Sequence, residues 1–148
     1  MAPTSLPRPL VLFGLSGILP QALCVVMALG GGEGRWIALA AGCLYAGLIL
    51  SFLGGLWWMA ALLANERASW PYLLAVLPSL AAWATFLPWC VGWRWPGPSL
   101  VILGLLLLGS PFVDRLLARR YAVPEGWIGL RIRMATGLGV LTLVLAIA

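Results

Sequence analysis

Five long apolar runs fill most of this chain, and its few charged residues stand in the gaps between them. Charged residues make up 9% of the sequence, whereas soluble globular chains carry about 25%. Too few polar side chains are present to cover a soluble core, so a lipid bilayer is the expected solvent. Crossing the hydrocarbon takes about 20 mostly apolar residues per helix, and five such helices use nearly all of the 148 residues. We therefore expect a single integral membrane domain over residues 1–148.

The apolar runs have the pattern of helices rather than of strands. A membrane β-barrel strand alternates apolar and polar residues over about 10 positions, but the stretch from Leu100 to Gly109 is continuously apolar. The sequence predicts an all-α membrane protein, a five-transmembrane-helix bundle. The expected spans are approximately 10–29, 36–64, 70–91, 99–117 and 127–148.

The arginines in the connecting segments predict the orientation, because cytoplasmic loops carry an excess of basic residues. One side holds Arg8, Arg67, Arg115, Arg119 and Arg120, with Arg131 and Arg133 close by, and the other holds Arg35 and Arg94. We expect the N-terminus inside and the C-terminus outside. The formal charge of +5 follows from these flanking arginines, so it reports orientation and no nucleic-acid partner is expected.

The second span carries small residues four positions apart. One row is Ala38, Gly42 and Ala46, and another is Gly47, Ser51 and Gly55, with Gly54 beside it. Small residues at this spacing let helix backbones approach closely inside a membrane. We expect this span to lie at the centre of the bundle, with Gly47, Ser51, Gly54 and Gly55 as helix-packing positions. In an alternative interpretation, Ser51 and Gly54 line a substrate path.

Asp114 is the one acid inside a predicted span. An ionisable residue at such a position is a candidate functional residue, because burying a charge in the membrane is costly. Arg131 is the expected partner, because an antiparallel hairpin between the fourth and fifth spans brings positions 114 and 131 to similar depth; Arg133 is a second candidate. The pair then stabilises the hairpin. Alternatively, Asp114 is a proton or cation site, helped by Pro111, whose ring frees a carbonyl one turn earlier. Ser51 and Ser79 complete this candidate polar site.

Four arginines form a predicted basic rim on the inner face: Arg119, Arg120, Arg131 and Arg133. Basic residues beside spans attract anionic headgroups by about 1 kcal/mol each near the surface. Anionic lipid is therefore an expected partner, although these residues also serve simply to set topology.

Enzyme signatures are sparse in this sequence. It has no histidine, no phosphate-binding loop, and no pair of intramembrane carboxylates for acid and base roles. Cys24, Cys43 and Cys90 lack a CxxC spacing, so we expect small buried packing residues rather than a disulfide or a soft-metal site. No catalytic residue, metal or cofactor is expected.

The second span also carries the best family match, a block of Tyr45, the run from Ile49 to Gly55, and Trp58. This block resembles the domain of unknown function 3429 family, integral membrane proteins that include mitochondrial transmembrane protein 69 and bacterial inner-membrane relatives. Weaker matches touch every other span: Gly14, Leu15, Gly17, Pro20, Pro78, Ser79, Leu80, Trp83, Asp114, Pro124, Trp127, Leu130, Arg131 and Thr136.

The chain departs from the family pattern at Trp57, where the family is more often basic, at Met59, where it is more often glycine, and at Ile128, where tyrosine is common. The resemblance implies a five-span fold in a bacterial inner membrane, with a mitochondrial inner membrane as the second choice. It implies no settled activity.

Two functions fit these observations. The first is a non-enzymatic structural, assembly or accessory partner of a larger membrane complex, bound to another membrane protein or to a second copy of itself. The second is a small transporter or lipid-binding protein with a polar site near Asp114 and Arg131. A polar cavity that reaches Asp114 favours the second function, whereas a sealed ion pair favours the first.

Overall fold

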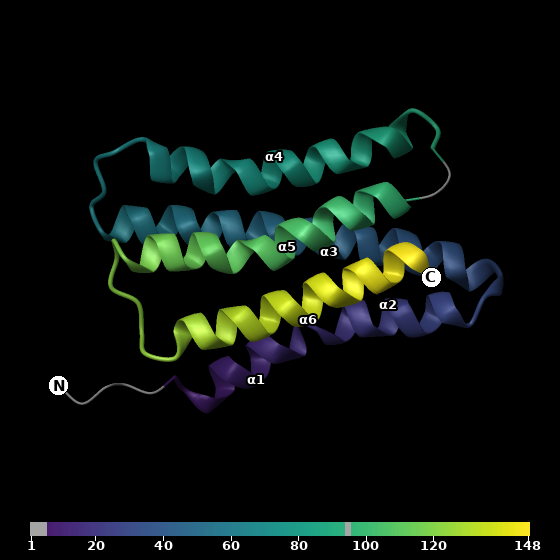
Figure 1. The fold of residues 1–148 in the computed structure, drawn as a ribbon, viewed down its shortest axis with the longest axis horizontal. Helices are drawn as coiled ribbons and strands as arrows, with labels where there is room; N and C mark the ends of the chain where they lie inside the picture. Colours follow the sequence, from purple (N-terminus) through teal and green to yellow (C-terminus); the bar gives the residue numbers. More distant parts are fainter. Residues whose placement is uncertain (1–5, 94–95) are drawn as a thin grey trace.

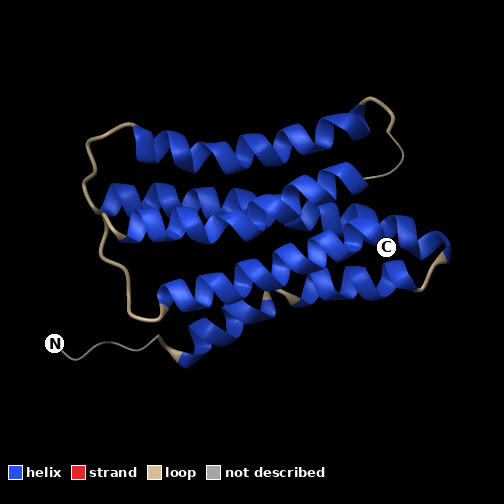
Figure 2. Cartoon of the chain, in the orientation of Figure 1, coloured by secondary structure: helices blue, strands red, loops and turns tan. Residues whose placement is uncertain are grey.

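A computed structural model describes residues 6–93 and 96–148, and every regular element in these ranges is a helix. Arg94 lies outside the described residues. The helices are α1 (Arg8–Ser16), α2 (Leu19–Leu29), α3 (Gly32–Leu63), α4 (Trp70–Cys90), α5 (Gly97–Ala118) and α6 (Trp127–Ile147), joined by short loops (Figures 1 and 2). With α1 and α2 taken together, five spans are long and apolar enough to cross a membrane. The predicted all-α five-span class is confirmed, and the orientation stays a prediction.

The first span is broken between α1 and α2, where we expected one continuous helix. Pro20 has no N–H to donate to the carbonyl one turn earlier, and its ring clashes with that turn. The chain therefore tightens at the break, where the N–H groups of Gly17 and Ile18 bond three residues back, to Gly14 and Leu15. The Tyr45 hydroxyl of α3 donates to the Gly17 carbonyl at 2.5 Å. The break thus supplies a backbone acceptor that ties α3 to the first span.

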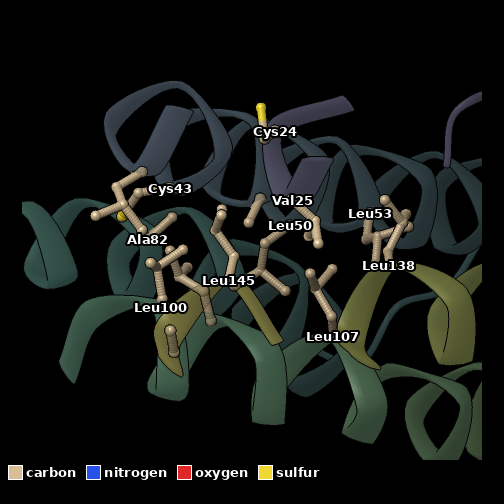
Figure 3. Close-up of a cluster of buried hydrophobic side chains, with 14 of the residues drawn as sticks. Cys24, Val25, Cys43, Leu50, Leu53, Ala82, Leu100, Leu107, Leu138 and Leu145 are labelled. Atoms are coloured by element: carbon tan, nitrogen blue, oxygen red, sulfur yellow. The ribbon is translucent and has the colours of Figure 1, made fainter. Parts of the chain in front are cut away.

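Helix α3 lies at the centre of the bundle, as expected, because α2, α4, α5 and α6 all contact it. Figure 3 shows part of the resulting core, in which Leu50 and Leu53 of α3 lie near Leu107 of α5 and Leu138 of α6. The outward faces carry large apolar side chains, including Phe52 of α3. Exposed apolar surface on all sides is what a lipid-embedded bundle requires.

The close-packing positions on α3 differ in part from the predicted row. Gly47 and Gly54 are buried against α4, where an added Cβ would overlap the Phe86 ring and the Ala75 carbonyl oxygen, respectively. Gly55 is exposed with nothing near its Cβ position, so its prediction as an internal packing residue was wrong. The reason is the helical repeat of about 3.6 residues per turn. Gly55, eight positions after Gly47, points about 80° away from it around the helix axis, whereas Gly54, seven positions after Gly47, points to within about 20° of it. Ser51 is half-buried, between the side of α3 that faces α4 and the outward side that carries Gly55.

Candidate functional site

Asp114 and Arg131 form a buried ion pair between α5 and α6. The Arg131 Nε donates to Asp114 Oδ2 at 2.9 Å, and the two side chains are 4% and 6% exposed, respectively. The antiparallel α5–α6 hairpin brings the two positions to one depth, as the sequence indicated. Removing one partner of a buried ion pair strongly destabilises the folded protein, because the other charge is left buried and uncompensated.

Trp57 adds a third helix to this pair. Its indole Nε1–H donates to Asp114 Oδ1 at 2.8 Å, and all three side chains are buried. Both carboxylate oxygens therefore accept a hydrogen bond, one from α3 and one from α6. The sequence did not predict this role for Trp57, and the available signal was that a buried indole N–H usually has a partner.

The carbonyl released by Pro111 is not open to a ligand. Pro111 cannot donate to the Leu107 carbonyl, but the Ser110 hydroxyl donates to it at 2.8 Å. Ser110 is itself buried. The expected exposed acceptor beside Asp114 is thus already occupied, and the prediction of an exposed carbonyl was wrong.

The other predicted members of the polar site lie apart from the Asp114–Arg131 pair. Ser79 and Arg133 are exposed, and Ser51 is half-buried. In the described residues, none of the three donates to or accepts from the Asp114 carboxylate. Ser79 lies on the outward surface of α4 because the residues of that helix that face the bundle are Ala75, Pro78 and Ala82.

The predicted basic rim is only partly available to lipid. Arg131 is buried against Asp114, so its assignment as a headgroup contact was wrong. Arg120 forms an ion pair with Glu66, and its guanidinium lies 5.6 Å from the Trp70 ring centroid. Arg119 and Arg133 are exposed, as lipid contact requires.

A cavity of about 410 Å³ adjoins the ion pair. It lies between the last turns of α3 and α5, the α5–α6 loop and the first residue of α6. Asp114 lines it, together with Trp57, Tyr121 and Trp127. Trp57 also lines a second cavity of about 290 Å³, which is bounded by α3, α4 and α5 and is almost wholly apolar.

Glu66 holds together the loops beside the larger cavity. Its carboxylate accepts hydrogen bonds from Arg120, from Tyr121 at 3.1 Å and from the Ala68 backbone N–H at 2.9 Å, while its carbonyl accepts one from Tyr72 at 3.0 Å. We refer to these residues as the Glu66 clasp. The Arg120 hydrogen bond, followed by that from Ala68, lowers the pKa of Glu66 to about 2. The sequence did not predict the clasp, which joins segments far apart along the chain.

The clasp predicts an acid-sensitive contribution to stability. The folded-state pKa of Glu66 is lowered from 4.5 to about 2, so the contribution is complete above the unfolded-state pKa and is lost as the pH falls toward 2. We expect the thermal unfolding midpoint in detergent to fall more steeply below pH 4.5 in the parent chain than in Glu66→Gln. Glu125→Gln, at an exposed loop position, is the matched control and keeps the steep parental profile. Parallel profiles for the parent and Glu66→Gln contradict the prediction.

A second buried polar contact joins α2 to α6. Gln21 Nε2 donates to Thr142 Oγ1 at 2.9 Å, and the Thr142 hydroxyl donates to the Leu138 carbonyl at 2.6 Å. Sequence reasoning missed this contact, although a glutamine inside an apolar span is itself a signal. Both residues are fully buried, so the contact packs two spans together.

The cysteines do not form a common site. Cys24 and Cys43 are buried and Cys90 is exposed, all three as free thiols. The expected buried packing role therefore fails for Cys90. Among the described residues, no three Cys, Asp or Glu side chains group in a way that could hold a metal ion.

The fold and the buried polar pair define a multi-pass helical membrane protein in which the buried acid Asp114 is paired within the bundle. The family model described as "Protein of unknown function (DUF3429)" matches residues 6–148. The chain belongs to this family, as its sequence resemblance indicated. No curated protein and no solved structure gives a significant match.

Proposed function

We propose that this chain is a non-enzymatic structural, assembly or accessory subunit of a larger membrane complex. The observation that carries the proposal is the pairing of Asp114, whose two carboxylate oxygens accept from Arg131 and Trp57. A carboxylate engaged on both oxygens and buried is poorly suited to take up a proton or a cation. Its role in the proposal is to fasten α3, α5 and α6 to one another.

The outward surface of α3 supports association with another helix. Gly55 is exposed with open space at its Cβ position, and the neighbouring Phe52 is 60% exposed. Inside a bilayer, small residues on an exposed face allow close approach of a second backbone. In the proposal, this face receives a helix of another subunit or of a second copy, in a bacterial inner membrane with the N-terminus inside.

Photo-cross-linking in native membranes tests the accessory role. A photoreactive amino acid replaces Phe52, beside Gly55, and in a control it replaces Phe13, which is exposed on α1. We expect one discrete heavier product from position 52 and none from position 13. The mass of the product separates a second copy from a different subunit. A chain that stays monomeric from position 52, and also after purification in mild detergent, contradicts the accessory role.

The lipid-binding alternative rests on a different observation, the cavity that Asp114 lines. Transport through the bundle is less well supported, because a passage needs a polar group free to exchange partners. The transporter alternative predicts that Asp114→Asn abolishes flux while leaving stability unchanged. The accessory proposal predicts the reverse, a loss of stability.

A further inference from the structure

The cavity beside Asp114 has the size of a ligand site. Its volume of about 410 Å³ lies within the range of about 300–1,000 Å³ that is usual for small-molecule pockets. Four separate segments form its walls, namely the ends of α3 and α5, the α5–α6 loop and the start of α6. A groove between two helices on the lipid-facing side would have fewer walls.

The lining of the cavity is amphipathic. Leu56, Leu63 and Leu117 supply apolar walls, whereas Asp114 and Tyr121 supply polar groups. Asp114 is neutralised by Arg131 at 2.9 Å, so the polar part does not repel an anion as a free carboxylate would. This lining suits the hydrocarbon part of a ligand. An oxygen-rich part fits outside the lining, because the Tyr121 hydroxyl already donates to Glu66 and the Asp114 carboxylate can only accept.

The charged residues around this end of the bundle favour a ligand of one charge sign. Arg115 lies on the last turn of α5, and Arg119 and Arg120 follow directly after the end of that helix, close in sequence to the cavity residues Leu117 and Tyr121. Glu66 neutralises Arg120, while Arg115 and Arg119 are exposed and form no ion pair in the described part of the chain. Neither arginine lines the cavity itself. Together they outweigh the exposed acid Glu125 of the α5–α6 loop, so this end of the bundle is net positive and attracts anionic headgroups.

We propose that this cavity binds one anionic phospholipid. Part of an acyl chain lies against Trp57 and Leu117, and the phosphate lies at the edge formed by Arg115 and Arg119. The proposal deepens the lipid-binding alternative by naming the class of lipid, and it is independent of the accessory role. Failure to obtain a cross-link from position 52 would contradict the accessory role and would not affect the lipid-site proposal.

Native mass spectrometry of the delipidated full chain tests this site with dioleoyl phosphatidylglycerol and dioleoyl phosphatidylcholine. Ala60 and Ala122 both line the cavity, so Ala60→Leu and Ala122→Leu fill it from two sides. We expect each to weaken phosphatidylglycerol binding about tenfold. Ala122 is an exposed loop residue, so its variant remains informative if Ala60→Leu fails to fold. Ala84→Leu, at an exposed α4 position outside the cavity lining, is the matched control and binds as the parent does.

The headgroup part of the proposal has its own readout. Arg119→Gln is expected to weaken phosphatidylglycerol binding about fivefold and to leave phosphatidylcholine binding unchanged. Inorganic phosphate at the same concentration is expected not to displace the bound lipid. Equal parental binding of the two lipids, parental affinity in both cavity-filling variants, or displacement by inorganic phosphate overturns the proposal.

Discussion

Replacing Asp114 with alanine is expected to lower the free energy of unfolding by about 3–5 kcal/mol, because the change leaves the buried Arg131 guanidinium without its counter-ion. It also leaves the Trp57 indole N–H without its acceptor. Arg131→Ala is expected to lower the free energy of unfolding by a similar amount, since it leaves the buried Asp114 carboxylate without its counter-ion. Reversible unfolding in mixed detergent–lipid micelles measures both effects.

Arg133→Ala is the control for this prediction, because Arg133 is exposed two residues along the same helix. We expect it to change stability by less than about 0.5 kcal/mol. If Asp114→Ala and Arg133→Ala have equally small effects, the Asp114–Arg131 pair does not hold the bundle together, and the structural role proposed for Asp114 is wrong.

Gly54→Ala is expected to destabilise the protein by about 1–3 kcal/mol or more, as overpacking does. The added Cβ would overlap the Ala75 carbonyl oxygen, and a backbone atom of α4 cannot move aside as a flexible side chain can. The α3–α4 interface must then separate. The midpoint of thermal unfolding in detergent, followed by circular dichroism, reports the loss.

The adjacent substitution Gly55→Ala separates a packing effect from helix propensity. Gly55 has open space at its Cβ position, so alanine there is expected to be neutral or to stabilise α3 by about 0.5–1 kcal/mol. Opposite signs for two neighbouring glycines support close approach of α3 to α4. Equal effects at both positions contradict it.

Most of the fold could be predicted because bilayer thickness and hydrophobic length determine where a span lies. The break between α1 and α2 was missed, since the apolar run continues through Gly17 and Pro20 and hydropathy does not register a lost backbone hydrogen bond. The Gly55 error has a related cause. A spacing of four follows a helix face for only about two turns before the face rotates away.

The candidate site was predictable only where it lies within one hairpin. Asp114 and Arg131 are seventeen positions apart on consecutive helices, so simple antiparallel geometry brings them together. Trp57 is fifty-seven positions from Asp114, and its contact depends on how α3 rotates against α5. The Glu66 clasp depends in the same way on where two loops meet. In neither arrangement does the local sequence indicate which residue is the partner.

The coupling free energy between Asp114 and Arg131 tests the structural role of the pair most directly. A double-mutant cycle compares Asp114→Ala, Arg131→Ala and the double variant with the parent, in the same micelles and by the same unfolding transition. We predict a favourable coupling of about 1.5–3 kcal/mol. The double variant then loses less stability than the sum of the losses in the two single variants. A coupling below about 0.5 kcal/mol, with additive losses, would show that the pair does not fasten α5 to α6.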